Sequence, residues 1–209
     1  MELKVLDING KETGELVSLA EEVFAIEPND HAIYLDVKQY LANQRQGTHK
    51  AKERGEITGS TRKLKRQEGH GDGPAGSIKS PVFKGGGRIF GPRPRDYFFK
   101  LNKKIKVLAR KSVLSYKARQ AEIVVLDSLT FDQPRTKAFV GVLKNLALDT
   151  KKILFITPDV DQNVYLSCRN LPKAQVIPSQ QINTYQVLNA EHLVLTKEAL
   201  SKIETMLKS

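Results

Sequence analysis

The sequence predicts an α/β fold: an open, mostly parallel three-layer sandwich interrupted by one long extended basic loop. From residue 122 onward, short aliphatic runs such as 123–126 and 153–156 alternate with amphipathic segments. Runs that are apolar on both faces are typical of strands buried in a parallel sheet that helices cover on two sides. Residues 44–96 differ, because only nine of these 53 side chains are apolar. Such a stretch cannot form a core, so we expect a globular domain of residues 1–43 and 97–209, with residues 44–96 as an extended loop.

The N-terminus is expected to form a small hairpin. Residues 3–8 alternate in polarity as a strand does, and Asn9-Gly10 is a turn signal. A second apolar run at residues 16–19 supplies the partner strand.

A helix is predicted on each side of the loop, and the two together would fix its base. Asn29 or Asp30 can cap the first helix, whose apolar face comprises Ile33, Val37, Tyr40 and Leu41. Asn102 can cap the second, whose stripe comprises Ile105, Leu108, Ala109, Ser112 and Tyr116.

The remainder of the chain alternates strands with helices. The strand at 123–126 precedes a helix bearing Phe139, Val142, Leu143 and Leu146, and the strand at 153–156 precedes one bearing Val160, Val164, Cys168 and Leu171. Strands at 176–177 and 193–195, each followed by a helix (near 184–188 and over 197–207), complete the pattern.

The positive charge is concentrated in the loop. Residues 44–96 hold 13 Lys and Arg against five Asp and Glu, which gives +8 of the chain's +11, and they hold 11 of its 14 glycines. A mobile cationic segment that a polyanion orders fits this composition, and a solubilising insertion is the alternative. We therefore expect nucleic acid as the partner.

The loop carries the residue types that RNA contacts use. Closely spaced cations neutralise phosphates, glycines 85–87 let backbone amides approach a phosphate, and two prolines stiffen the run 91–95. Phe83 and Phe90 offer faces for unpaired bases, or else pack onto the protein at the loop base. The residues predicted to bind RNA are Arg45, Lys50, Lys52, Arg54, Arg62, Lys63, Lys65, Arg66, Lys79, Phe83, Lys84, Arg88, Arg93, Arg95, Lys103 and Lys104.

The apparent enzyme motifs lack the neighbouring sequence features that their functions require. Residues 71–76 satisfy G-x-G-x-x-G, but no strand precedes them and Pro74 does not open an apolar-striped helix. His49 and His70 lack neighbours at metal-ligand spacing, apart from Asp72 beside His70. We expect no catalytic residue, no cofactor and no metal site.

The carboxyl ends of the strands are the default ligand site of such a sheet, here Asp127, Thr157, Asp159 and Pro178. Asp159 is interpreted as a helix N-cap. Cys168, the only cysteine, falls on an apolar helix face and is interpreted as core rather than nucleophile. A lone cysteine, no signal-peptide pattern and no apolar run of membrane-spanning length indicate a cytoplasmic protein without a membrane partner.

Several runs closely resemble the bacterial large-subunit ribosomal protein four family over essentially the full chain. They are Arg45-Gln46-Gly47-Thr48, Gly76-Ser77-Ile78-Lys79-Ser80-Pro81, Gly85-Gly86-Gly87, the run from Phe90 to Tyr97, and Lys103-Lys104 followed by Ala109-Arg110-Lys111-Ser112. The resemblance implies a non-catalytic constituent of the large ribosomal subunit whose loop penetrates the ribosomal RNA and lines the peptide exit tunnel. It also implies contact with ribosomal protein twenty-two and with the nascent peptide, and an early role in subunit assembly.

The chain departs from that family at the loop tip. Glu68, Asp72 and Pro74 stand where the family usually has basic residues, and Phe83 stands where tryptophan is usual. Two carboxylates are poor neighbours for phosphate, so we expect the tip to face an open, water-filled space. The predicted tunnel-facing residues are Gln67, Glu68, Gly69, His70, Gly71 and Asp72. A nucleotide-using α/β enzyme and an RNA-binding regulator outside the ribosome are the competing hypotheses.

Overall fold

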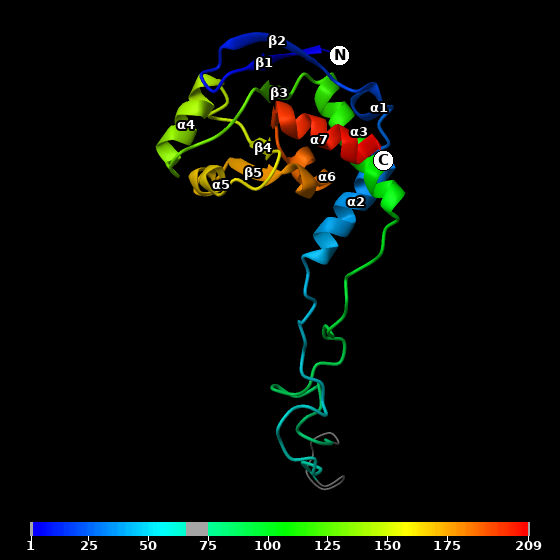
Figure 1. The fold of residues 1–209 in the computed structure, drawn as a ribbon. Coiled ribbons are helices and arrows are strands. Elements are labelled where there is room, and N and C mark those ends of the chain that lie inside the picture. Colours follow the sequence, from blue (N-terminus) through cyan, green and yellow to red (C-terminus); the bar gives the residue numbers. More distant parts are fainter. Residues whose placement is uncertain (1, 66–74, 209) are drawn as a thin grey trace. The chain divides into compact units, whose positions relative to one another are not determined.

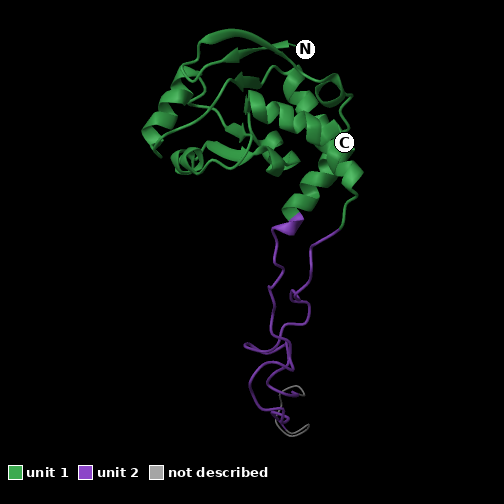
Figure 2. Ribbon diagram, in the orientation of Figure 1, with its two compact units in different colours: residues 1–41, 100–209 green, residues 42–99 purple. Residues whose placement is uncertain are grey.

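A computed structural model describes residues 2–65 and 75–208 of the chain (Figure 1). The chain divides into two compact units, unit 1 with residues 1–41 and 100–209, and unit 2 with residues 42–99 (Figure 2). The α/β elements lie in unit 1, and the glycine-rich basic stretch lies in unit 2.

Unit 1 is built on a six-stranded sheet of order β2-β1-β3-β6-β4-β5. Only β1 and β2 pair antiparallel, and every other neighbouring pair is parallel. The predicted open, mostly parallel fold is therefore confirmed. The strands are β1 Glu2–Leu6, β2 Glu12–Ser18, β3 Ile123–Leu126, β4 Ile153–Thr157, β5 Ala174–Pro178 and β6 His192–Thr196.

Successive side chains of the central strands enter two separate cores. In β4, Leu154 and Ile156 pack into one apolar cluster, whereas Ile153 and Phe155 pack into the other. Because side chains alternate across a strand, these clusters lie on opposite faces of the sheet. The first contains residues of the helices α1 Glu21–Phe24, α2 Asp30–Asn43, α3 Lys103–Arg119, α6 Thr184–Asn189 and α7 Lys197–Lys208. The second contains residues of α4 Thr136–Asn145 and α5 Gln162–Cys168. The sheet is thus the middle of three layers.

The N-terminal hairpin extends this sheet. Its turn is closed by the Asp7 amide donating to the Lys11 carbonyl (2.9 Å) and the Gly10 amide donating to the Asp7 carbonyl (2.9 Å). Val5 of β1 pairs with Val125 of β3 in parallel. The predicted hairpin is confirmed, and its joining the parallel sheet is an addition that the sequence had not indicated.

Six helices match the predicted positions with local differences, whereas the first helix, Glu21–Phe24, and the 3-10 helix, Ser179–Gln181, were not predicted. Asn29 caps α2 by accepting from the Ala32 amide (2.9 Å). Asn102 holds the N-cap position of α3, although its side chain makes no capping bond. Val160 and Leu171 lie outside α5.

The N-cap interpretation of Asp159 is wrong. Asp161 caps α5 instead, because its carboxylate accepts from the amides of Asn163 (2.9 Å) and Val164 (3.3 Å). Asp159 stands two residues too early to reach those amides.

Polar and aromatic contacts hold α2 within unit 1. The Tyr116 hydroxyl of α3 donates to Asp30 (2.7 Å), and the Thr184 hydroxyl of α6 donates to Asp36 (2.5 Å). The rings of Tyr40 and Tyr185 stack with their centroids 4.9 Å apart. The expected apolar face of α2 is only partly buried, since Leu41 is exposed.

Candidate nucleic-acid interface

The described part of unit 2 consists of two arms, residues 42–65 and residues 75–99. Single backbone hydrogen bonds hold these two arms together. The Arg95 amide donates to the Gly47 carbonyl (3.2 Å), and the Ala51 amide to the Pro92 carbonyl (3.0 Å). Farther along, the Arg88 amide donates to the Lys52 carbonyl (3.0 Å), and Lys63 forms an isolated antiparallel bridge with Ser77. Within residues 44–65 and 75–99 there is no helix or strand. These described residues of the arms therefore lack regular secondary structure, but specific backbone hydrogen bonds fix their conformation.

Glycines stand where backbone segments of unit 2 approach each other closely. Gly47 has φ +66°, and a Cβ there would lie 2.0 Å from the Arg95 carbonyl oxygen. A Cβ at Gly86 would lie 1.9 Å from the Ser80 oxygen, and one at Gly87 would lie 2.4 Å from the Arg54 nitrogen. These positions admit no larger residue without a shift of the backbone.

The interpretation of glycines 85–87 as phosphate donors is wrong for two of them. The Gly86 amide donates to the Phe83 carbonyl (2.9 Å), and the Gly87 amide donates to the Lys79 carbonyl (3.0 Å). The tight winding of residues 77–87 uses these amides internally. Gly85 has φ +84° and open space beside it.

The Tyr97 ring contacts two arginines, Arg45 and Arg95, that lie fifty positions apart in the sequence. The Arg45 guanidinium lies 3.6 Å from the centroid of the Tyr97 ring, and the Arg95 guanidinium lies 4.7 Å from it. A hydrogen bond with Arg95, followed by the charges of Arg45 and Arg95, lowers the pKa of the Tyr97 phenol. The ring face holds both cations in position. Tyr97 was not among the predicted site residues, and its place beside arginines in the run 90–97 is the sequence signal that could have identified it.

Two other predicted cations already have acidic partners. Lys50 forms an ion pair with Glu56, and Arg93 forms one with Glu53 (2.7 Å). The hydrogen bond from Lys50 is the main cause that lowers the pKa of Glu56. Part of the charge at this level of the arms is therefore compensated within the protein.

The structure brings five of the predicted cations around one hollow. This hollow, which we call the distal pocket, has a volume of about 690 Å³. Its lining includes the aliphatic side chains of Ile57, Leu64 and Ile78 and the cations Arg62, Lys63, Lys65, Lys79 and Lys84. No carboxylate belongs to the described lining.

The remaining described residues that were predicted to bind RNA lie outside the lining of the distal pocket. Lys52, Arg54 and Arg88 are exposed on the arms, and Lys103 and Lys104 are exposed in the first turn of α3 in unit 1. Phe90 is 98% exposed and does not pack onto the protein, whereas Phe83 is half-buried. Arg66 and the predicted tip, Gln67, Glu68, Gly69, His70, Gly71 and Asp72, lie outside the described residues.

The carboxyl ends of the strands form an acidic pocket. It has a volume of about 210 Å³, and the charged residues that line it are Asp127, Asp159, Asp161 and Glu198, with no lysine or arginine among the described lining. The phosphates of a nucleotide would be repelled there.

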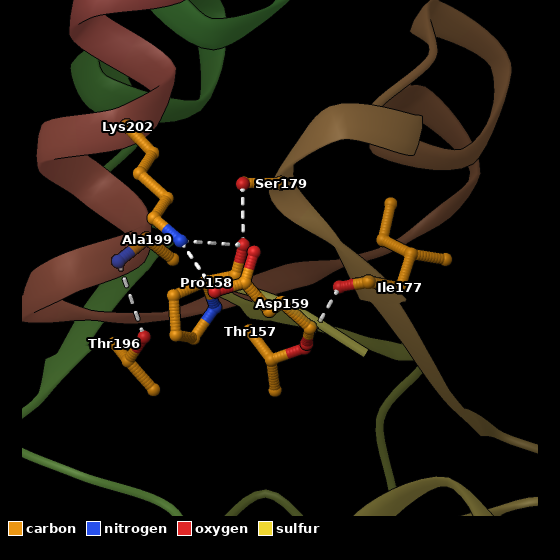
Figure 3. Close-up of polar contacts among 8 residues, drawn as sticks. All are labelled: Thr157, Pro158, Asp159, Ile177, Ser179, Thr196, Ala199 and Lys202. Carbon is orange, nitrogen blue, oxygen red and sulfur yellow. Dashed lines mark hydrogen bonds and ion pairs between the residues drawn. The ribbon is translucent and has the colours of Figure 1, made fainter. Parts of the chain in front are cut away.

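The polar groups around this pocket are engaged in structural contacts. Figure 3 shows Lys202 paired with Asp159 (2.5 Å) and the Ser179 hydroxyl donating to the Pro158 carbonyl (2.9 Å). The Thr157 hydroxyl donates to the Asp159 carbonyl (2.7 Å), and the Thr196 hydroxyl accepts from the Ala199 amide (3.3 Å). The polar groups at this edge of the sheet therefore serve to stabilise the fold. This observation argues against the hypothesis of a nucleotide-using enzyme.

Cys168 also lacks the properties of a nucleophile. It is buried in the second apolar cluster, and burial raises its pKa to about 12. Its interpretation as a core residue is confirmed. In the described part of the chain, no three His, Cys, Asp or Glu residues group as a metal site would require, and no helix has the length and apolarity to cross a membrane.

A folded α/β unit joined in one chain to an irregular, cation-rich unit is typical of the class of proteins that bind polyanions. Comparison with known sequences narrows this class. The chain belongs to the ribosomal protein L4/L1 family, whose sequence model matches residues 17–206.

Curated relatives match it over nearly their whole length. The chain is 61% identical over 207 residues to a protein of Christiangramia forsetii, covering 99% of this chain and 100% of that one. It is 60% identical over 204 residues to one of Flavobacterium johnsoniae, covering 98% of each, and 58% identical over 207 residues to one of Cytophaga hutchinsonii, covering 99% and 100%. Each relative is named large ribosomal subunit protein uL4.

Proposed function

We propose that this chain binds large-subunit ribosomal RNA through unit 2 while unit 1 forms a stable body. The protein is a structural constituent of the large ribosomal subunit and not an enzyme, and it works in the cytoplasm as part of that particle. Ribosomal RNA and neighbouring ribosomal proteins are its partners.

One observation carries the proposal for unit 2. Twelve of the predicted RNA-binding cations lie in its described residues, and all of them are exposed except Lys79, which is half-buried. They stand on arms that contain no helix or strand there, so phosphates can approach them from several directions. The neighbouring Phe90 adds an exposed ring on which an unpaired base can stack.

The finer role extends this proposal. The loop within unit 2 would enter the ribosomal RNA and line the peptide exit tunnel, with ribosomal protein twenty-two as a neighbour and the nascent peptide beside residues 67–72. Binding early in subunit assembly fits an arm that RNA must surround. The net charge of −2 over residues 67–73, with His70 neutral, supports a tip that faces water rather than phosphate.

Co-sedimentation tests the function. A tagged copy of the chain, expressed in a bacterium that carries one of the reported relatives, should migrate with the large subunit in a sucrose gradient. The expected ratio is one copy per particle. A variant with residues 48–94 replaced by a short glycine-serine linker should keep a cooperative unfolding transition and yet be lost from the particle. Free migration of the unaltered chain would refute the proposal.

A further inference from the structure

Specific hydrogen bonds hold the two sides of the distal pocket together in unit 2. Its two sides, around residues 57–65 and 78–85, are joined by the bridge between Lys63 and Ser77 and by the Leu64 amide donating to the Gly76 carbonyl (3.1 Å). The buried Ser77 hydroxyl donates across to the Ser60 carbonyl (3.1 Å). Its volume of about 690 Å³ falls within the range of roughly 300–1,000 Å³ that is typical of sites for small ligands.

Three cations of the pocket differ from the paired cations elsewhere in unit 2. Lys50 and Arg93 have carboxylate partners, whereas the described residues give no ion pair to the side chains of Arg62, Lys79 or Lys84. A concave surface lined by cations concentrates positive potential and attracts an anion into the hollow. Under the proposed function, the anion that reaches this pocket is a phosphate of the ribosomal RNA backbone.

Apolar surface accompanies this charge. Ile57, Leu64 and Ile78 line the same hollow, and Leu64 and Ile78 remain exposed to solvent. Exposed aliphatic side chains within a cationic pocket suit a ligand that has both a flat apolar face and a negative group. A nucleotide has both, because its base presents an apolar face and its phosphate carries the charge.

We propose that the distal pocket receives one unpaired nucleotide extruded from the RNA. Arg62, Lys79 and Lys84 contact its phosphate, and the base lies against Ile57, Leu64 and Ile78. A double helix presents its bases stacked and paired inside a convex rod, so only an extruded nucleotide can enter the pocket. The inference rests on the proposed function and specifies which RNA feature unit 2 recognises.

Two RNA hairpins and the unaltered chain test this inference. One short RNA hairpin carries a single bulged 2-aminopurine, whose fluorescence rises when the base leaves the helical stack, and the other lacks the bulge. The unaltered protein should bind the bulged hairpin at least about tenfold more tightly and raise its fluorescence. Ile78→Ser keeps every charge and should remove this preference while leaving the affinity for the plain hairpin unchanged. Val82→Ser, at an exposed residue outside the pocket lining, is the matched control and should keep the preference.

The outcomes separate the inference from the function on which it rests. Equal affinity for the two hairpins, or an unchanged preference in Ile78→Ser, would overturn the pocket assignment and leave RNA binding in place. A poly-glutamate peptide that bound as tightly as the bulged hairpin would instead assign the pocket to an acidic protein segment. Failure of both hairpins to bind at low salt would overturn the inference together with the proposed function.

Discussion

Unit 1 and unit 2 hold their backbones in place by different means. Unit 1 buries apolar side chains on both faces of a six-stranded sheet. The described part of unit 2 relies on single hydrogen bonds between its arms, exposed ion pairs and close glycine contacts. Burial of apolar surface involves no charge that salt can screen, whereas exposed hydrogen bonds compete with water and exposed ion pairs are screened by salt. The difference indicates that unit 1 supplies the stability of the protein and unit 2 supplies its charge.

The largest expected effect lies in the core of unit 1. Phe155 in β4 is 1% exposed and packs edge-on against Phe139, with the ring centroids 4.9 Å apart. Phe155→Ala should lower the free energy of unfolding by about 3–5 kcal/mol, measured by urea denaturation. Phe90→Ala in unit 2 is the matched control and should change it by less than about 0.5 kcal/mol. Comparable losses of stability in the two variants would contradict the assignment of the protein's stability to unit 1.

A second effect concerns charge within unit 2. Replacing Arg62, Lys79 and Lys84 by glutamine should flatten the slope of log affinity for RNA against log salt by about 2–3, because three phosphate contacts are lost. The matched control is Lys50→Gln with Glu56→Gln, which removes an ion pair and keeps the net charge. Its slope should stay unchanged. If both variants flattened the slope equally, the distinction between paired and unpaired cations would be wrong.

The third effect is local to the arms. Gly47→Ala places a Cβ at φ +66° and 2.0 Å from the Arg95 carbonyl oxygen, so it should weaken the local structure of unit 2 by about 1–2 kcal/mol. Faster hydrogen exchange at the Arg95 amide, which donates to Gly47, would report this loss. The urea midpoint of unit 1 should not move. Gly55→Ala, with open space around it, should leave the exchange rate unchanged.

The smallest effect is a pH dependence confined to unit 1. Desolvation, followed by the charge of Lys151, lowers the pKa of His192 below its usual value near 6.5. The unfolded chain therefore binds the proton more readily, and stability should fall as the pH decreases below about 6.5. Urea titrations at several pH values would measure this slope, and His192→Gln should reduce it. An undiminished slope in that variant would assign the dependence to another group.

Much of unit 1 could be predicted because burial on both faces of a sheet produces uninterrupted aliphatic runs. The run Ile153 to Ile156 shows this directly, since its alternate residues enter different cores. Local chemistry was harder to assign. Asp159 and Asp161 are both suitable caps by type, and only the backbone geometry selects Asp161.

Unit 2 was predicted in composition but not in its contacts. The amides of Gly86 and Gly87 are used internally because residues 77–87 wind tightly, and no local pattern reveals that winding. The cluster of Arg45, Arg95 and Tyr97 forms because the arms meet at Gly47. Such long-range pairings have no periodic signal along the chain.

The lone cysteine has a practical consequence. With its thiol buried and its pKa near 12, Cys168 holds almost no thiolate at neutral pH, so it should react slowly with maleimides and iodoacetamides. The natural chain can therefore serve as its own unreactive background for labelling. A cysteine introduced at exposed Phe90 would be the single fast-reacting thiol. A fluorophore attached there would report RNA closing around the arms in real time, with no need to remove a native residue from the core.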